Sequence, residues 1–454
     1  MQLKKGQIIE FTVDALVFGG KAIGEFEGLK VFVNKALPGD RVSASLTKIK
    51  KNYAEAQFVE LLEPSKDRVK ARCQHAGTCG GCTFQELPYE KQLEAKKQFV
   101  VDAFERIGGL QNPPVRDVIA CEDQFYYRNK MEFSFGYDAE MKFAMGMHLP
   151  GRRYDILNLK ECHLQSRDTV ELLSKVRGFV RRRKWNPFKY SCGQGFLRSL
   201  FVREGKRTGE LMIVLSTSDD IPKDLDEGLA ELSEILGEKV TSFYWSQVIS
   251  KRGSPKQIKE KLIRGRKTLK EDMILANGDE LSFEIAPQAF FQPNTFQAEK
   301  LYAEILKLVE GGEFAFDLFC GTGTIGLFMA KHVGHVLGIE LNESAVAVAR
   351  ENAQKNAIFN IDFFVGDVGK LIGTLKEKPS VIVIDPPRAG LNEKTIAKIS
   401  EFDCERIIYV SCNPSTLARD CQWLAEFGYK VESVQPVDMF PHTYHIENVC
   451  LLKR

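Results

Sequence analysis

The chain has 454 residues, of which 44% are hydrophobic and 27% are charged, and its net charge is +2. This length exceeds one ordinary core and predicts roughly two or three domains of a soluble globular protein. No apolar run approaches a membrane span, and the first residues do not form a signal peptide, so we expect a cytoplasmic protein without a membrane partner. The charge is uneven, since residues 177–207 hold ten Lys or Arg against one Glu and residues 251–270 hold nine against one. A basic middle favours a polyanionic partner.

Residues 1–63 alternate polar and apolar side chains in short runs, which are separated by glycine and proline turns. Four or five short strands at this spacing predict a small OB-like β-barrel. Lys48, Lys50 and Lys51 fall in one loop of this barrel. Such lysines either form a solvated surface or contact nucleic acid, and the run alone does not choose between the two.

A cluster of cysteines follows, and its members are Cys73, Cys79 and Cys82, with Cys162 as a distant fourth candidate. Three close thiolates and one distant thiolate can hold a zinc ion or an iron–sulfur cluster, and the spacing does not decide between them. Three unliganded thiols are the remaining alternative, although core filling explains such a cluster poorly. We expect His75 and His163 to be neighbours of this site rather than ligands.

Apolar residues at helical spacing over 89–107, followed by two glycines, predict a packing helix. Residues 125–285 combine strands and helices with two basic stretches, 181–184 and 264–270. The first stretch is interleaved with the aromatic residues Trp185, Phe188 and Tyr190. RNA bases can stack on such rings while phosphates pair with the cations. Core aromatic residues beside surface arginines explain the pattern equally well.

Residues 314–330 predict an apolar strand, a turn with Gly321 and Gly323, and a helix from Thr324. A second strand ends in Glu340, and glycines followed by an acid at the next strand end favour a ligand that contains adenosine. The dinucleotide fingerprint would place a glycine at position 324, and its absence, with Asp317 inside the first strand, favours S-adenosylmethionine over NAD. A third strand ends in Asp367, whose carboxylate either reaches the adenine or lies in a plain surface turn.

Two later β-branched runs, 381–384 and 407–410, end in residues that can do chemistry, Asp385 and Cys412. Strands separated by helices predict a parallel sheet, and the carboxyl ends of its strands share one rim, so we expect Asp385 and Cys412 to lie together. A cysteine at a strand end is more often core filling than a nucleophile. A nucleophilic thiol would need a lowered pKa, which a nearby cation or the helix after Asn413 can supply.

Several motifs in order resemble one family: FCGTGT at 319–324, Glu340, DPPR at 385–388, SCNP at 411–414 and HIENVCLL at 445–452. With the phrase FFQPN at 290–294, the chain resembles the S-adenosylmethionine-dependent RNA uracil-5-methyltransferases over nearly its whole length. It is most similar to the branch with an N-terminal TRAM barrel and a [4Fe-4S] cluster. The resemblance implies that the four cysteines bind this cluster rather than zinc.

The resemblance also implies roles for individual residues. Cys412 would be the nucleophile and Glu447 the base, while S-adenosylmethionine would contact Gln292, Phe319, Glu340 and Asp385. Uracil C5 is a poor nucleophile, so a thiolate must add at C6 before C5 can take a methyl group, and a base then removes the C5 proton. His442 and His445 are the alternative bases.

We therefore expect an α/β multidomain protein with three parts. A TRAM-like β-barrel over 1–63 would bind RNA, and a central α+β domain over 64–285 would carry the iron–sulfur site and bind RNA. A Rossmann-like methyltransferase domain would follow over 286–454, with a helix near 96–120 packed on it. We expect no obligate protein partner and a monomer.

The expected function is methylation of uridine C5 in structured RNA, with 23S rRNA preferred and tRNA as the alternative. An RNA cytosine-5 methyltransferase is a rival, and it would need an acid facing N3 of the base. A non-catalytic RNA-binding protein is a second rival, against which the intact Cys412 and Glu447 argue. A radical methyltransferase would need an iron atom left open, whereas four cysteines would saturate the cluster.

Overall fold

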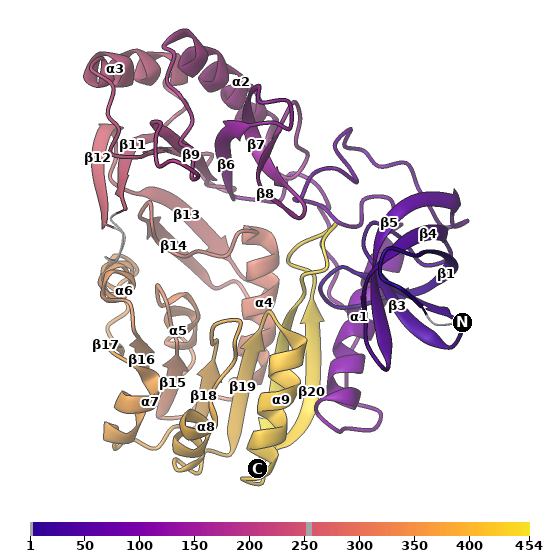
Figure 1. The fold of residues 1–454 in the computed structure, drawn as a ribbon. Helices are drawn as coiled ribbons and strands as arrows, with labels where there is room; N and C mark the ends of the chain where they lie inside the picture. Colours follow the sequence, from indigo (N-terminus) through magenta and orange to yellow (C-terminus); the bar gives the residue numbers. More distant parts are fainter. Residues whose placement is uncertain (1–2, 251–256) are drawn as a thin grey trace.

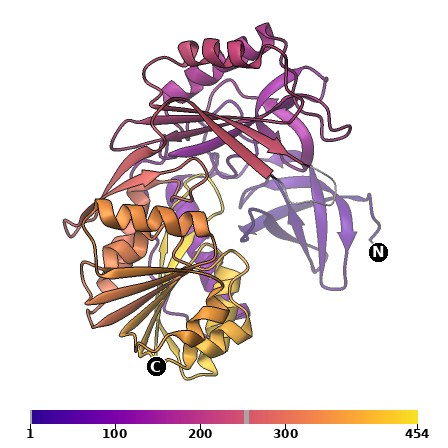
Figure 2. The same ribbon diagram turned by 90° about the vertical axis from the view of Figure 1, so that its left-hand side faces the viewer.

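The computed structural model describes residues 3–250 and 257–454 (Figure 1), so residues 251–256, the first part of the basic range 251–270, lie outside the described residues. The chain forms three bodies: a small N-terminal barrel, a central sheet with two helices on one side, and a C-terminal sheet between helices (Figures 1 and 2). Among the described residues, no helix has the length and apolar character that a membrane crossing requires.

The N-terminal strands close into a barrel of order β1-β2-β3-β5-β4. They are β1 (Ile8–Leu16), β2 (Ala22–Phe26), β3 (Leu29–Val33), β4 (Arg41–Ile49) and β5 (Tyr53–Glu63). Alternate residues of β1, such as Ile9, Phe11 and Val13, point into the core, as the period-two pattern predicts. The predicted small barrel is confirmed.

The central domain is built on a mixed sheet of order β12-β11-β10-β9-β6-β7-β8. Its strands are β6 (Lys130–Tyr137), β7 (Phe143–Leu149), β8 (Arg152–Asn158), β9 (Leu197–Glu204), β10 (Leu211–Thr217), β11 (Ser242–Ile249) and β12 (Gln257–Gly265). Helices α2 (Arg167–Arg182) and α3 (Leu225–Leu236) cover one face of this sheet (Figure 1). The opposite face is turned towards the C-terminal domain.

Arg183 of the first basic stretch and the neighbouring Trp185 have structural partners in this domain. Arg183 forms ion pairs with acidic residues at the start and middle of α3, namely Asp224, Glu227 and Glu231. Trp185 is buried, and its indole nitrogen donates to Asp224 at 3.2 Å. The proposal that bases stack on Trp185 is therefore wrong, because its ring is part of the core, whereas Tyr190 is exposed.

Helix α1 (Tyr89–Arg106) packs on the C-terminal domain, where Val100, Ala103 and Phe104 join a core with strand and helix residues of that domain. The helix ends before two glycines, so the range 96–120 expected for the packed helix is wrong in its second half. Residues 107–120 instead run along the edge of the sheet, where Val115 and Ile119 form parallel bridges with Val434 and Val437.

The C-terminal sheet has the order β17-β16-β15-β18-β19-β21-β20, and β21 runs antiparallel to both of its neighbours. The strands are β15 (Phe314–Leu318), β16 (His335–Glu340), β17 (Ile361–Val365), β18 (Val381–Ile384), β19 (Arg406–Ser411), β20 (Lys430–Val437) and β21 (Glu447–Lys453). Its helices are α4 (Thr295–Leu308), α5 (Thr324–Met329), α6 (Glu343–Lys355), α7 (Val368–Leu371), α8 (Glu393–Ser400) and α9 (Pro414–Ala425), with a 3-10 turn at Ile372–Thr374. Figure 2 shows helices on both faces of this sheet.

A hairpin of β13 (Leu269–Ile274) and β14 (Glu280–Ile285) precedes the boundary expected at 286, yet it shares the core of the C-terminal domain. The amide of Ser282 donates to Asn356, which directly follows α6, and the amide of Glu284 donates to Asn352 of α6, each at 2.8 Å. The strand order reverses between β15 and β18, and open α/β sheets bind ligands at the carboxyl ends of the strands beside such a reversal.

Candidate active site

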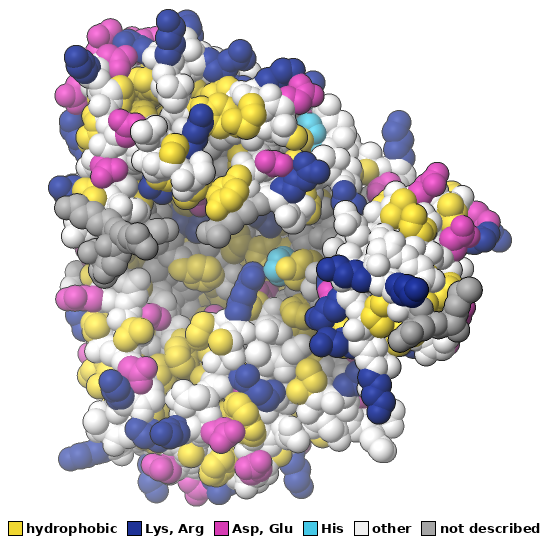
Figure 3. Space-filling view, viewed as in Figure 1, with side chains coloured by type: hydrophobic (Ala, Val, Ile, Leu, Met, Phe, Trp, Pro, Cys, Tyr) yellow, Lys and Arg dark blue, Asp and Glu magenta, His cyan; other side chains and the backbone are white. Residues whose placement is uncertain are grey.

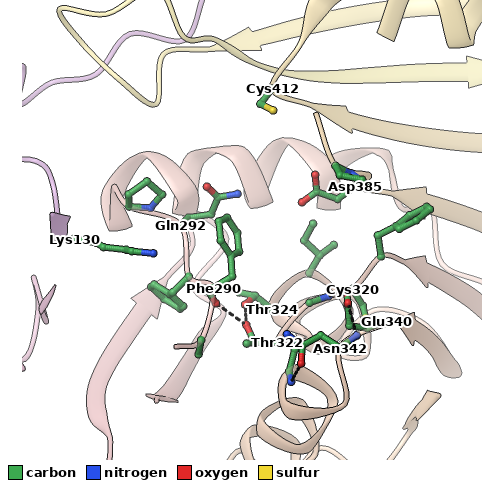
Figure 4. Close-up of a pocket in the computed structure, with 18 of the residues that line it drawn as sticks. Lys130, Phe290, Gln292, Cys320, Thr322, Thr324, Glu340, Asn342, Asp385 and Cys412 are labelled. Atoms are coloured by element: carbon green, nitrogen blue, oxygen red, sulfur yellow. Dashed lines mark hydrogen bonds between the residues drawn. The ribbon is translucent and has the colours of Figure 1, made fainter. Parts of the chain in front are cut away.

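A cavity of about 940 Å³ lies at the carboxyl ends of β15, β16, β18 and β19. The segment 286–293 and the start of β6 form its opposite wall, so two domains enclose it (Figure 4). Figure 3 shows the hollow between the three bodies from outside. Most of the candidate site residues predicted from the sequence line this cavity, and their positions are described below.

The glycine turn after β15 is tied to the acid at the end of β16. The amide of Gly321 donates to Glu340 Oε2 at 3.1 Å, and the amide of Asn342 donates to Oε1 at 2.8 Å. Phe319 begins the turn with a left-handed backbone, φ 64°. Phe319, Gly321, Thr324 and Glu340 all line the cavity. The carboxylate is thus held at the rim with its orientation fixed.

Gly323 and Asp367 do not line the cavity. Gly323 adopts φ 76° before α5, and a Cβ on it would lie 2.6 Å from the Phe363 ring, so only glycine fits this close packing. The carboxylate of Asp367 accepts a hydrogen bond from the amide of Lys370 at 3.1 Å and caps α7. Asp367 is exposed and caps a helix, as the surface-turn alternative expects.

Two aspartates stand on the strand ends beneath the cavity. Asp317 accepts a hydrogen bond from the Gly326 amide at 2.8 Å, and burial raises the pKa of this carboxyl to about 7. Burial also raises the pKa of Asp385 to about 7. These acids therefore carry little charge below neutral pH, and a cationic or hydrogen-bonding ligand would favour their ionised form.

The segment with Gln292 is fastened to both domains. The Asn129 side chain at the start of β6 donates to the Gln292 carbonyl at 2.8 Å and to Thr295 Oγ1 at 2.9 Å. Thr322 Oγ1 donates to the Phe290 carbonyl at 3.3 Å. Gln292 is buried and lines the cavity, so the wall that carries it is set by contacts from the central domain and from the glycine turn.

Cys412 lies directly after β19 and lines the same cavity as Asp385, as expected from their shared rim. Burial, Glu447 and Asp385 raise the pKa of the Cys412 thiol to about 11, and Arg388 acts in the opposite direction. The cation that a nucleophilic thiol would need is present as Arg388, but desolvation outweighs its effect on the pKa of Cys412. The Asn413 side chain caps α9 and also donates to the Arg388 carbonyl at 3.1 Å.

Glu447 begins β21 and is buried in the cavity wall. Burial and Asp385 raise the pKa of Glu447 well above its usual value, and Arg388 opposes the shift. His445 also lines the cavity, and burial and neighbouring cations lower its pKa to about 4. His442 lies behind the wall, where its Nδ1 is 3.2 Å from Gln92 Nε2, so of the two alternative bases only His445 faces the cavity.

The four predicted cysteine ligands, Cys73, Cys79, Cys82 and Cys162, line one separate small cavity as free thiols. His75 Nε2 accepts from the Lys160 amide at 3.1 Å, and His163 Nδ1 lies 3.1 Å from the Tyr126 hydroxyl, so both rings have other partners. Within residues 3–250 and 257–454, no group of three or more His, Cys, Asp or Glu side chains is arranged to hold a metal ion.

Donors are nevertheless directed at three of these sulfurs, as suits thiolate ligands. The amides of His75 and Gly81 donate to Cys73 and Cys79 at 3.4 Å, and Gln85 Nε2 donates to Cys82 at 3.2 Å. Burial raises the pKa of Cys79 to about 11 and of Cys82 to about 12. The convergence of the thiols fits a group bound by thiolates, whose positive metal ions would favour deprotonation.

Sequence reasoning missed three basic residues of the main cavity. Arg388 lies in the DPPR motif, so its position could have been found from Asp385. Arg128 and Lys130 come from the start of β6 in another domain. They belong to neither basic stretch, and only the folded chain brings them to the site.

A family model described as tRNA (Uracil-5-)-methyltransferase matches residues 88–454, and a TRAM domain model matches residues 2–59. The chain belongs to the tRNA (uracil-5-)-methyltransferase family. Uncharacterized RNA methyltransferases of Clostridium tetani and Chlorobaculum tepidum are 37% identical over 462 residues and 38% identical over 479 residues. Each alignment covers 100% of this chain, and 99% and 98% of those two proteins.

This methyltransferase is also similar to a solved structure over almost its whole length. The crystal structure of the Pyrococcus abyssi tRNA (uracil-54, C5)-methyltransferase in complex with S-adenosyl-L-homocysteine has a TM-score of 0.77 and 28% identity, covering 98% of this chain and 99% of that one. The protein is therefore an S-adenosylmethionine-dependent RNA methyltransferase with a TRAM barrel, and the predicted family and fold class are confirmed.

Proposed function

We propose that the protein forms 5-methyluridine in structured RNA through a covalent bond between Cys412 and C6 of the target uracil. One observation carries the proposal: Cys412, Glu447 and the Glu340 side of the glycine turn line a single cavity. In that arrangement a nucleophile and a base would face the target uracil, while a carboxylate would bind the adenosine part of the cofactor beside it. The target base must leave its stack to reach the cavity.

S-adenosylmethionine supplies an electrophilic methyl group. Glu340 would bind its ribose hydroxyls, while Gln292, Phe319, Gly321, Thr324 and Asp385 would form the rest of its site. Gly323 would support the cofactor site by keeping the glycine turn close to α6. Asp367 would contact the adenine of the cofactor from the end of β17.

The Cys412 thiolate would add to C6, and the electron pair of the C5–C6 double bond would then make C5 nucleophilic. Arg388 stabilises the thiolate, since it opposes the rise in the pKa of Cys412. After C5 has taken the methyl group, Glu447 would accept the C5 proton, the C5–C6 double bond would form again and the C6–S bond would break, which releases the Cys412 thiolate. The raised pKa of Glu447 makes its carboxylate a stronger base than an exposed one.

We propose rRNA, and 23S rRNA in particular, as the substrate, on the combination of a TRAM barrel with four converging cysteines. A tRNA substrate is the second candidate, and the similarity to the Pyrococcus abyssi tRNA enzyme favours it. We also propose that the protein acts as a monomer without an obligate protein partner.

The test is incubation of the purified protein with methyl-labelled S-adenosylmethionine and total RNA that lacks this modification. The RNA is separated into rRNA and tRNA and digested to nucleosides. Label in 5-methyluridine supports the proposal, and the labelled pool identifies the substrate. Label in 5-methylcytidine would contradict it.

Variants test the covalent step. Glu447→Gln should accumulate a methylated RNA–protein adduct that survives denaturation, because the C5 proton cannot be removed. Cys412→Ser should form no such adduct, while Cys192→Ser, which changes an exposed thiol, should behave as the parent does. An adduct that persists in Cys412→Ser would assign the nucleophile elsewhere.

We propose that Cys73, Cys79, Cys82 and Cys162 hold a [4Fe-4S] cluster that anchors the segment between the barrel and α1. Protein purified without oxygen should contain iron and acid-labile sulfide in equal amounts and show broad visible absorbance. Cys162→Ser should lose this absorbance, whereas Cys121→Ser, at a buried thiol outside the site, should keep it. Zinc in place of iron and sulfide would contradict the assignment.

A further inference from the structure

We propose that Lys130, with Arg203 behind it, forms an oxyanion subsite for the phosphate of the nucleotide whose base enters the cavity. This inference rests on the proposed function and adds a specific contact between the central domain and the RNA. It concerns the cavity wall opposite the glycine turn.

Lys130 is the first residue of β6, and Figure 4 shows its side chain reaching into the pocket near Gln292 and Phe290. Arg203 is its register partner on β9. Both cations lie over the ring of Phe201, at 5.4 Å for Lys130 and 5.5 Å for Arg203. Two positive charges therefore lie side by side: Lys130 lines the cavity, and Arg203 lies behind it.

Neither cation has an anionic partner among residues 3–250 and 257–454. Arg203 is only 1% exposed and donates to the Ala289 carbonyl at 2.7 Å, while its Nε and Nη1 are buried without a partner. Glu132 is the acid that acts on Lys130, but it is exposed and accepts a hydrogen bond from Ser199 Oγ at 2.6 Å. Burial lowers the pKa of both cations, and the charge of Arg203 lowers the pKa of Lys130 further.

A cation removed from water without a counterion costs free energy. Arg203 is buried and Lys130 is half-buried, so both should be stabilised when an anion binds beside Lys130. The substrate offers phosphates, and the cofactor offers one carboxylate. The cofactor residues stand on the C-terminal sheet, at Glu340 and the glycine turn, whereas Lys130 belongs to the domain across the cavity. The space between them is where the nucleotide that Cys412 attacks must lie, and this favours its phosphate as the occupant.

The test compares Lys130→Met with Lys130→Arg, which retains the charge. Methionine keeps an apolar stem over Phe201, and circular dichroism and thermal unfolding confirm that each variant folds. The matched control is Lys175→Met, on α2, where an exposed lysine pairs with Glu171 at 3.0 Å. Two bindings are measured for each protein: S-adenosylhomocysteine by calorimetry, and unmodified 23S rRNA fragments and tRNA transcripts by fluorescence anisotropy over a range of salt.

Lys130→Met should weaken RNA binding about tenfold, as expected for one charge-assisted hydrogen bond. The slope of log affinity against log salt should fall by about 0.7, which corresponds to one phosphate contact in single-stranded RNA. Binding of S-adenosylhomocysteine should be unchanged, Lys130→Arg should recover most of the RNA affinity, and Lys175→Met should match the parent.

Two results would overturn the inference. Weaker binding of S-adenosylhomocysteine with unchanged RNA binding would assign the subsite to the cofactor carboxylate. Unchanged binding of both would leave the two cations without an anionic ligand. If the parent protein makes no 5-methyluridine, the proposed function fails, but the binding comparison still decides whether Lys130 contacts an RNA phosphate.

Discussion

A fully buried ion pair connects α1 to the segment that leads to Glu447, and breaking it should destabilise the C-terminal domain strongly. Lys96 Nζ lies 2.5 Å from Asp438 Oδ1, and both side chains are 0% exposed. Lys96 also donates to the Phe440 carbonyl at 3.0 Å, and the Tyr89 hydroxyl donates to Asp438 Oδ2 at 2.7 Å. Lys96→Met would fill the same space but leave a buried carboxylate without its cation.

Removal of one partner from a buried pair costs about 3–5 kcal/mol. For a domain of roughly 150–250 residues, each kcal/mol lowers the unfolding temperature by about 2–4 °C, so a fall of roughly 6–20 °C is expected. Differential scanning calorimetry measures this fall, and hydrogen exchange of the segment 438–446 shows whether the loss is local. Lys97→Met is the matched control, since its partner Asp117 is 95% exposed and their contact of 2.7 Å is on the surface.

The charge argument has a further control. Lys96→Met combined with Asp438→Asn removes the uncompensated charge while an amide oxygen still accepts from Tyr89, so the double variant should be more stable than Lys96→Met alone. Equal unfolding temperatures for Lys96→Met and Lys97→Met would refute the reasoning. Lower stability of the double variant than of Lys96→Met would show that packing, rather than charge, sets the cost.

Three other predictions concern the main cavity. Arg388→Met should raise the pKa of Cys412 further and therefore slow the alkylation of Cys412 by iodoacetamide at mildly alkaline pH. Mass spectrometry measures the alkylation rate, with the exposed Cys192 as the internal reference. Equal alkylation rates of Cys412 in the variant and the parent would contradict the prediction. Asp385→Asn should stabilise the ligand-free protein by an amount that grows as pH rises from about 4 to about 7, because the folded state holds a proton that the unfolded state has lost. Thermal unfolding across pH measures that gain, and a constant gain would count against it. Gly323→Ala should weaken S-adenosylhomocysteine binding in calorimetry, because its Cβ would displace Phe363 and shift the glycine turn.

The features that could be predicted from the sequence are those that local pattern determines. Alternation gives the barrel strands, and β-branched runs between helices give a parallel sheet with Asp385 and Cys412 at one rim. The spacing of Glu340 after the glycines gives a contact that the structure contains, since its carboxylate accepts from the Gly321 amide. In each case, neighbours along the chain or on adjacent strands carry the information.

Other features depend on contacts between distant segments, and the sequence could not supply them. The cations at 181–184 left an RNA surface and a structural role equally open, and only the fold shows that Arg183 pairs with α3, more than forty residues later. The sequence shows that a nucleophilic Cys412 thiol would need a lowered pKa, but the actual pKa depends on its burial and on Glu447, Arg388 and Asp385, which only the fold places around it. Lys130 and Arg128 reach the cavity only because the central sheet faces the C-terminal domain.

The segment 438–446 shows why the parts of this enzyme depend on one another. Its His442 carbonyl accepts hydrogen bonds from the amides of Thr83 and Phe84, directly after the ligand candidate Cys82. Gln92 of α1 accepts from the His442 amide at 2.9 Å, and Tyr444 packs against Phe18 of the barrel side. His445, within this segment, and Glu447, directly after it, both line the cavity. A change in the cysteine site, α1 or the barrel can therefore displace the base without touching the cofactor residues, so such variants should lose turnover before they lose binding of S-adenosylhomocysteine.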